Sequence, residues 1–361
     1  MILHDPQTAG LAPALRDMGA LVVWRSHVGT DDLTPVVENA WSFLLPYVTA
    51  ADAFVFSRAQ FVPPMLADRR LHVISPSIDP TGTKNKFMPN DAVAAILEHT
   101  GLVQSHEAGW TQPRFTRRDG AVVRHCAEVL RYGPPPRFGV DPLVLHIARW
   151  DRLKDPVGVL RGFAEHVLSD VDAHLVMAGP GPRSVADDPE AELVFSEVTR
   201  AWRRLSPPHR SRIQLALLPN EDLEENAAIV NALQRAADVV VKKSLEEGFG
   251  LGITEAMWKA RPIVASRVGG IQQQIEHERS GLLIDDPRYL AAFGAAVRRL
   301  LLDETTARQL GAAAHRRASA RFLHGRHLAE WLNLAATVVR NGARAGSQRE
   351  ARYSARSTSA A

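Results

Sequence analysis

The segment from Lys243 to Ala256 places glycines between two carboxylates, since Glu247 and Glu255 enclose Gly248, Phe249, Gly250, Leu251 and Gly252. It follows an apolar run and enters a predicted helix. Main-chain N–H groups at a helix N-terminus are unpaired and lie at the positive end of the helix dipole, and glycines let an anion approach them closely. We therefore predict that this segment binds a diphosphate while the glutamates accept hydrogen bonds from sugar or ribose hydroxyls. The alternative is a plain turn in which Glu255 only favours the start of a helix.

Two cations follow another apolar run. Arg149 emerges directly from the predicted strand Leu143–Ala148, and Lys154 follows a short way along the chain. Ligands of open α/β sheets bind at the carboxyl ends of the strands. At that edge, Arg149 and Lys154 would neutralise the negative charge of a departing diphosphate. The alternative is solvated charge on a strand-to-helix loop, which is common.

From Leu143 onward, short apolar runs alternate with longer amphipathic segments, a pattern typical of βαβ units around a parallel sheet. We interpret residues 141–320 as one doubly wound, Rossmann-like α/β domain. The predicted strands are Leu143–Ala148, Ala173–Ala178, Ile213–Leu218, Asp238–Lys242, Pro262–Ser266 and Gly281–Ile284, and the predicted helices include Pro156–Val167, Ala191–Leu205 and Glu221–Ala236.

The first eighty residues repeat a shorter version of this pattern. They are too few for a full domain of this class, which needs roughly 100 residues, and Met1–Leu3 resemble the end of a strand. We therefore expect residues 1–80 to form a partial domain with a segment missing upstream, and residues 81–140 to form an interdomain connection with an insertion. The predicted strands here are Ala20–Trp24, Ala53–Phe56 and His72–Ile74, with a helix at Val36–Tyr47.

The end of the chain and the composition limit the partners. We expect helices over Glu304–Gly311 and Ala312–Val339, with 321–340 as the C-terminal helix, and a disordered tail over 341–361, which is rich in Ser, Ala, Arg and Gly. That tail accounts for the whole formal charge of +3, so a basic nucleic-acid-binding face is not expected.

The cysteine and histidine content limits which disulfides and metal sites the protein can have. The single cysteine excludes an internal disulfide, and no apolar run reaches the length of about 18 residues that a membrane span needs. A cytoplasmic protein without membrane insertion is predicted. The histidines are scattered and no Cys/His spacing suits metal ligation, so no metal site is predicted.

The pairs Arg149-x4-Lys154 and Glu247-x7-Glu255, in this order, resemble the retaining glycosyltransferases of family 4. The resemblance runs through most of residues 143–302. It implies a GT-B fold, in which two Rossmann-like domains face a cleft, with the N-terminal (acceptor) domain incomplete here. It also implies that Arg149 and Lys154 bind the leaving diphosphate, that Glu247 contacts the donor sugar, and that Glu255 contacts the nucleotide ribose. No tightly bound cofactor is implied, although Mg²⁺ can accompany the nucleotide.

Further segments resemble the trehalose-forming glucosyltransferases of that family. The resemblance implies transfer of glucose from a nucleoside-diphosphate glucose to glucose, with retention at the donor carbon. In such enzymes the leaving phosphate oxygen receives the acceptor's proton, so no protein nucleophile is required. His4 would face the cleft and hydrogen-bond a sugar hydroxyl or the donor phosphate; the alternative is a histidine that caps a loop. The segments are His4-Asp5-Pro6-Gln7, Trp24-Arg25-Ser26-His27, Pro76-Ser77-Ile78-Asp79-Pro80 with Lys84-Asn85, Glu255-Ala256-Met257-Trp258-Lys259 and Val268-Gly269-Gly270-Ile271.

Other functions stay open at this point. Retaining trehalose phosphorylases of fungal type share much of the pattern, and phosphate rather than a nucleotide would then support turnover. A chain with an incomplete acceptor domain could instead be a non-catalytic nucleotide-sugar binder. The expected small-molecule partners are a nucleotide sugar and glucose, and the sequence does not distinguish a monomer from a homodimer.

Overall fold

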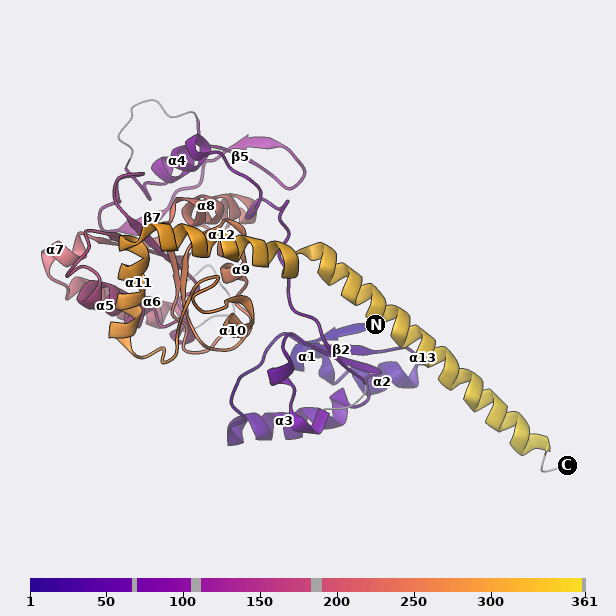
Figure 1. Ribbon diagram of the computed structural model, residues 1–361. Helices are drawn as coiled ribbons and strands as arrows, with labels where there is room; N and C mark the ends of the chain where they lie inside the picture. The colour runs from indigo at the N-terminus through magenta and orange to yellow at the C-terminus, as the bar shows by residue number, and fades with distance from the viewer. Residues whose placement is uncertain (67–69, 105–111, 183–189, 359–361) are drawn as a thin grey trace. The chain divides into compact units, whose positions relative to one another are not determined.

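The computed structural model divides the chain into two compact units, each built on its own sheet (Figure 1). Unit 1 comprises Met1–Ser77 with His324–Ala361, and unit 2 comprises Ile78–Leu323. The residues that the structure describes are 1–66, 70–104, 112–182 and 190–358.

Unit 2 contains a seven-stranded sheet in the order β13-β12-β11-β8-β9-β10-β7. All neighbouring strands are parallel except β7, which pairs with β10 in the antiparallel direction. The parallel strands agree with the predicted ones to within two residues at each end, so the doubly wound sheet is confirmed. The strands are β7 (Leu130–Tyr132), β8 (Leu143–Ile147), β9 (His174–Pro180), β10 (Ile213–Leu218), β11 (Val239–Lys242), β12 (Ile263–Ser266) and β13 (Leu282–Ile284).

Helices cover both faces of this sheet because successive strand residues point to opposite sides. Leu143 and Leu145 of β8 enter a core formed with α4, α8, α9 and α12, whereas Val144 enters a second core formed with α5, α6 and α11. Both faces are thus apolar, which explains the near-continuous apolar strands. The helices are α4 (Asn90–His99), η3 (Arg152–Lys154), α5 (Pro156–His166), α6 (Ala191–Arg203), α7 (Pro207–Arg210), α8 (Leu223–Ala236), α9 (Leu251–Trp258), α10 (Ile271–Gln274), α11 (Leu290–Leu302) and α12 (Glu304–Arg321).

Residues 81–140, predicted to be a connection and an insertion, belong to unit 2. Helix α4 packs against α8, β5 (Arg114–Thr116) pairs with β6 (Val122–Arg124) in a hairpin, and β7 extends the main sheet. Arg117 ties the hairpin to the start of α8 through an ion pair with Asp222. Each of these three strands has only three residues and one of them is an arginine, so no apolar run marks the strand in the sequence. Residues 105–111 of the predicted insertion lie outside the described residues.

Unit 1 contains a four-stranded parallel sheet in the order β1-β2-β3-β4. Trp24, Phe54 and Phe56 pack with α1, α2 and α3 on one face, and Val23 and Val55 point to the other face. Strand β2 begins three residues later than the prediction, and the other predicted elements of this unit agree within one residue. The elements are β1 (Ile2–His4), α1 (Asp5–Ala9), α2 (Ala12–Asp17), β2 (Val23–Ser26), α3 (Pro35–Val48), β3 (Ala53–Phe56), η1 (Ala59–Phe61), η2 (Pro64–Leu66) and β4 (Leu71–Val73).

Helix α13 (His324–Thr358) covers the second face of the unit 1 sheet. Leu334 and Val338 pack there against Val23 and Val55. The final helix of the chain therefore completes the core of the first unit, although hundreds of residues separate them in the sequence. Secondary-structure periodicity alone gives no indication of this pairing.

The prediction for the end of the chain was wrong in two respects. The expected helix over 312–339 is interrupted at Phe322, between α12 and α13, and the expected disordered tail over 341–361 continues α13 as far as Thr358. Alanine, arginine, glutamine and glutamate favour a helix even where apolar residues are too few to build a core. Residues 359–361 lie outside the described part of the chain.

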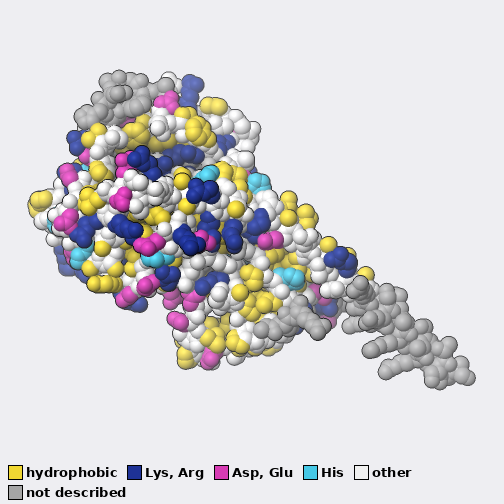
Figure 2. Space-filling view, in the orientation of Figure 1, with side chains coloured by type: hydrophobic (Ala, Val, Ile, Leu, Met, Phe, Trp, Pro, Cys, Tyr) yellow, Lys and Arg dark blue, Asp and Glu magenta, His cyan; other side chains and the backbone are white. Residues whose placement is uncertain are grey.

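Charged side chains of both signs are interspersed on the face of the molecule shown in Figure 2. Within the part of the chain that the structure describes, no helix combines the length and the hydropathy needed to cross a membrane.

Candidate donor-binding site

The carboxyl ends of β8 and β11 meet in the middle of the unit 2 sheet. These two strands are neighbours, yet the chain continues from β8 to β9 and β10 on one side, and from β11 to β12 and β13 on the other. Ligands of doubly wound sheets bind where the strand order reverses in this way. Arg149 follows β8 and Glu247 follows β11, so the predicted residues lie at this switch point.

The loop after β8 carries the two predicted cations. Arg149 is 56% exposed, and its guanidinium donates a hydrogen bond to Asp151 Oδ2 at 3.1 Å. The other carboxylate oxygen of Asp151 accepts from the N–H of Leu153 at 2.8 Å and so caps the short turn η3, which ends at Lys154. One aspartate thus fixes the turn and orients the arginine at the sheet edge.

Further contacts join this loop to the loop after β11. Asp155 adopts a left-handed conformation (φ 46°) and caps α5 by accepting from the N–H of Gly158. The buried ammonium of Lys243 forms an ion pair with Asp155, and the N–H of Leu245 donates to the carbonyl of Leu153 at 2.7 Å. The two loops therefore form one rigid edge.

Lys154 and Glu247 form the central pair of this edge. The ammonium of Lys154 lies 3.0 Å from Glu247 Oε1, and the two side chains are only 14% and 11% exposed. The hydroxyl of Ser244 donates to the other oxygen of Glu247 at 3.3 Å. Because Lys154 carries three N–H donors and gives one to Glu247, it can bind an oxygen anion while it holds the carboxylate in place.

The glycine-bearing loop is shaped by two further glycines. Gly250 has a φ of 85° and directly precedes α9. Gly269 has a φ of 48°, and a Cβ atom there would lie 1.6 Å from the carbonyl oxygen of Glu247; one on Gly270 would lie 2.6 Å from that of Gly248. Only glycine permits the loop after β12 to approach so closely. This loop therefore packs directly against the backbone of residues 247–249.

A buried glutamine supports the same loop from behind. Gln274 at the end of α10 donates to the carbonyl of Phe249 and accepts from the hydroxyl of Thr254. The loop is thereby joined to the first turns of α9. Its amides keep a fixed direction, as a preorganised anion site requires.

Glu255 is the second buried carboxylate of the edge. It lies in α9 and is 7% exposed, and the ammonium of Lys84 lies 2.9 Å from its Oε1. Two Glu–Lys pairs therefore flank the glycine loop, Glu247 with Lys154 and Glu255 with Lys84.

A third lysine lies beneath the loop. Lys242 ends β11, and its buried ammonium donates to the carbonyl of Ile147 at 3.0 Å. A Cβ atom on Gly252 would lie 3.9 Å from that ammonium, so the charge lies under the first turn of α9. Burial lowers the pKa of Lys242, and the nearby carboxylates of Glu247 and Glu255 oppose that shift.

His146 in β8 reports the same electrostatic environment. Its burial, reinforced by the neighbouring ammonium of Lys242, lowers the pKa of the imidazole to about 3. The ring is therefore neutral at physiological pH. Lys243 and Lys154 lower the pKa further, so several ammonium groups lie near this end of β8.

His4 belongs to unit 1. It ends β1, and its Nδ1 lies 2.9 Å from Nε2 of His27, with the two rings stacked. The next residue, Asp5, has a φ of 60° and accepts a hydrogen bond from the N–H of His27. Trp24 Nε1 donates to the carbonyl of Asp5. This network fixes the loop at the carboxyl ends of β1 and β2.

The structure thus brings most of the predicted site residues together at one edge of unit 2: Arg149, Lys154, Glu247, Gly248, Phe249, Gly250, Leu251, Gly252 and Glu255. The sequence reasoning assigned no site role to Lys84, Lys242 or Gln274. Gly269 and Gly270 entered the sequence analysis only as part of a resemblance, although a glycine doublet can mark a close approach of two backbones. The others lie far from the motif in sequence or within a strand, where only the fold reveals them.

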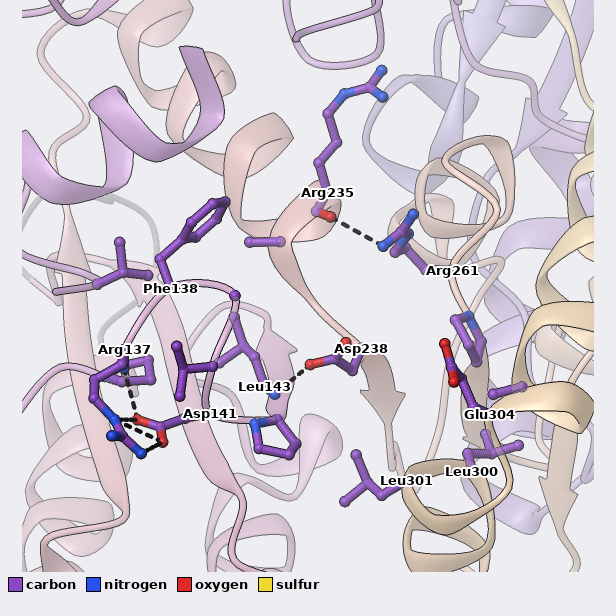
Figure 3. Close-up of a pocket in the computed structure, with 18 of the residues that line it drawn as sticks. Arg137, Phe138, Asp141, Leu143, Arg235, Asp238, Arg261, Leu300, Leu301 and Glu304 are labelled. Atoms are coloured by element: carbon purple, nitrogen blue, oxygen red, sulfur yellow. Dashed lines mark hydrogen bonds and ion pairs between the residues drawn. The ribbon is translucent and has the colours of Figure 1, made fainter. Parts of the chain in front are cut away.

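A separate cavity of about 560 Å³ lies at the opposite, amino-terminal ends of the strands (Figure 3). Its charged groups already have partners: Arg137 pairs with Asp141, the N–H of Leu143 donates to Asp238, and Arg261 donates to the carbonyl of Arg235. Ligands of doubly wound sheets bind at the carboxyl ends of the strands, so we do not assign the diphosphate to this cavity. Among the described residues, no group of three or more His, Cys, Asp or Glu side chains is arranged to hold a metal ion.

Comparison with known proteins agrees with this geometry. Residues 141–303 match the family described as glycosyl transferases group 1, and residues 1–63 match the trehalose synthase N-terminal domain. A trehalose synthase from Rubrobacter xylanophilus is 32% identical over 94% of this chain and 69% of that protein. The chain belongs to the trehalose synthase family of group 1 glycosyltransferases. A second relative of this glycosyltransferase, the trehalose synthase of Pyrococcus horikoshii, is 26% identical over 92% of this chain and 68% of that protein. The trehalose phosphorylase of Grifola frondosa is 24% identical over 94% of this chain and 44% of that protein.

Solved structures place this glycosyltransferase in the GT-B fold. Sucrose-phosphate synthase from Thermosynechococcus elongatus is similar with a TM-score of 0.67 at 19% identity, over 94% of this chain and 73% of that chain. Anabaena HepE in complex with UDP-glucose is similar with a TM-score of 0.64 at 16% identity, over 94% of this chain and 78% of that chain. The predicted fold class and the predicted family are both confirmed.

Proposed function

We propose that this glycosyltransferase transfers glucose from a nucleoside-diphosphate glucose to free glucose and forms trehalose with retention at the donor carbon. The observation that carries the proposal is the Lys154–Glu247 pair at the start of α9, at the switch point of the sheet. The similarity to trehalose synthases supports the acceptor and the product. The HepE structure with UDP-glucose supports a nucleotide sugar as donor.

The roles of the residues follow from charge and position. The diphosphate would lie against the amides of residues 250–252, with Arg149 and Lys154 stabilising the charge that develops as it leaves. Glu247, held by Lys154, would accept hydrogen bonds from the donor sugar, and Glu255 from the ribose. The acceptor's proton passes to the leaving phosphate oxygen, so positioning and electrostatics suffice and no side chain becomes covalently bound. Any Mg²⁺ would arrive with the nucleotide.

His4 would act from unit 1 on the same donor or on the acceptor. Its close contact with His27 leaves one ring nitrogen of His4 available to a sugar hydroxyl or a phosphate oxygen. The left-handed Asp5 and its hydrogen bond to His27 would hold that ring in position.

The test is an incubation of the chain with ¹³C-labelled glucose and one donor at a time, either UDP-, ADP- or GDP-glucose or glucose 1-phosphate, followed by NMR of the products. We expect α,α-linked trehalose and release of the nucleoside diphosphate with at least one donor. Trehalose formed only from glucose 1-phosphate would indicate a phosphorylase instead. Nucleotide binding by calorimetry without any product would indicate a non-catalytic binder. Either outcome would contradict the proposal.

A further inference from the structure

The segment Asp79–Lys86 lies outside both stretches that match known families. Its centre is Asn85, which is buried. The ammonium of Lys259 donates to Asn85 Oδ1 at 3.1 Å, to Gln234 Oε1 at 2.8 Å and to the carbonyl of Glu255 at 3.3 Å. A buried lysine with three acceptors has satisfied all its donors, so Lys259 serves to hold this segment against α8 and α9.

The backbone on both sides of Lys84 is also fixed. Asn231 in α8 donates to the carbonyls of Thr83 and Lys86, at 3.0 Å each. Trp258 Nε1 donates to the carbonyl of Asn85 at 3.0 Å. Side chains of two helices thus hold the backbone on both sides of Lys84. The fold therefore determines the direction in which the side chain of Lys84 extends.

The side chain of Lys84 differs from these anchors because it remains open to solvent. Lys84 is 43% exposed, whereas its partner Glu255 is 7% exposed. An ammonium that gives one N–H to a carboxylate keeps two others that can bind a ligand. An exposed ammonium over a buried carboxylate can receive a ligand with both anionic and hydroxyl groups, such as a nucleoside diphosphate.

We propose that Lys84 is a donor-binding residue, which orients Glu255 toward the ribose and supplies a cation to the diphosphate on the side of the loop opposite Lys154. This inference rests on the proposed function and extends the site beyond the segment that matches the glycosyltransferase family. The donor is then held by two Glu–Lys pairs, one contributed entirely by residues 154 and 247 and the other by residues 84 and 255.

The test is calorimetric titration of the full chain with UDP, ADP and GDP. We expect Lys84→Met to raise the Kd of the preferred nucleotide by about 10-fold or more, since a charge-assisted hydrogen bond and the orientation of Glu255 are lost together. Lys84→Arg, which keeps the charge, should retain most of the affinity. Lys86→Met is the matched control: Lys86 is in the same segment and donates to the carbonyl of Arg117 at 3.1 Å, so its loss should leave the Kd unchanged.

A double variant distinguishes a direct role of Lys84 in nucleotide binding from a general loss of structure around it. Because Lys84 acts with Glu255, the Kd of Lys84→Met/Glu255→Gln should rise by less than the product of the two single effects. If the parent chain binds a nucleotide and Lys84→Met binds it equally well, this inference is overturned while the proposed function stands. If the parent chain binds none of the three nucleotides, the proposed function fails, and this inference fails with it.

Discussion

Single residues at the edge of the unit 2 sheet serve more than one purpose. Asp151 caps a turn and orients Arg149, and Asp155 caps α5 and pairs with Lys243. The sequence predicted Arg149, Lys154, Glu247 and Glu255 because their positions after apolar runs and beside glycines coincide with a spacing that resembles family 4 glycosyltransferases. It could not predict a role for Lys84, whose nearness to Glu255 depends on how residues 79–86 fold onto α8 and α9.

Arg149 is the residue whose removal separates chemistry from stability. We expect Arg149→Ala to lower kcat/KM for transfer by about 100-fold or more, because a cation that stabilises the leaving diphosphate is lost. Its exposed side chain contributes little to the fold, so the free energy of unfolding should change by less than about 0.5 kcal/mol. Steady-state assays and denaturant unfolding measure the two quantities.

Arg152 provides the control for that substitution. It lies in the same loop after β8 and is similarly exposed, but it pairs with Glu197 and Glu190 of the α6 region. Arg152→Ala should retain transfer activity. Equal losses of activity in the two variants would show that the charge of the loop, rather than the position of Arg149, is what matters.

Gly269 tests the backbone geometry of the glycine loop. A Cβ atom at this position would overlap the carbonyl of Glu247 and would require a left-handed conformation. We expect Gly269→Ala to abolish detectable nucleotide binding and to destabilise unit 2 by at least about 1 kcal/mol. Gly10→Ala, at an ordinary φ of −61° with open space around it, should change neither quantity. Normal nucleotide affinity in Gly269→Ala would argue against the loop as the diphosphate site.

At the scale of elements, apolar periodicity located the strands and main helices of both units well, because buried parallel strands and amphipathic helices have distinct patterns. It failed where a short strand carries a charged residue or where two packing partners are distant. Strands β5, β6 and β7 have three residues each, and one of the three is an arginine, so no apolar run marks them. The break at Phe322 is set by packing: Phe322 is buried against Phe249 and its carbonyl accepts from the N–H of Ile78.

Strand β8 carries a titratable group whose effect on stability has a definite sign. The pKa of His146 is lowered to about 3, well below the value of about 6.5 in an unfolded chain. The unfolded state therefore binds more protons between these two pH values, and the stability contributed by the neutral ring is complete above about pH 6.5 and is lost as the pH falls toward 3. In that pH range the free energy of unfolding should change by up to about 1.4 kcal/mol per pH unit because of His146, and His146→Gln should remove this pH dependence. Parallel stability profiles for the two proteins in urea unfolding would contradict this account.

At the scale of the whole molecule, unit 1 is assembled from two distant parts of the chain, whereas unit 2 is one continuous stretch. Unit 1 takes α13 from the C-terminus, and unit 2 includes α4 and the strands β5, β6 and β7 that precede β8. Sequence motifs predicted the family and the fold class because the loops at a switch point carry the chemistry. They could not show which helix covers which sheet, because any amphipathic helix can pack against an apolar sheet face.

Leu334 tests the assembly of unit 1. Its side chain is buried with Val23 and Val55, whereas Leu332 on the same helix is exposed. We expect Leu334→Ala to cost about 2–5 kcal/mol and to speed amide hydrogen exchange in β2 and β3. Leu332→Ala should leave the exchange rates unchanged. Mass spectrometry measures the exchange. If the amides of β2 and β3 are equally protected in both variants, α13 does not stabilise this sheet.

We expect a nucleoside diphosphate to bind where β8 and β11 end, at the start of α9. A crystal structure of the full chain with UDP or ADP is the measurement that checks this placement. The diphosphate should lie within hydrogen-bond distance of the amides of residues 250–252 and of the side chains of Arg149 and Lys154, with the ribose at Glu255. This placement would be contradicted by a nucleotide bound elsewhere, for example in the cavity lined by Arg137, Asp238 and Arg261, with none bound at the loop before α9.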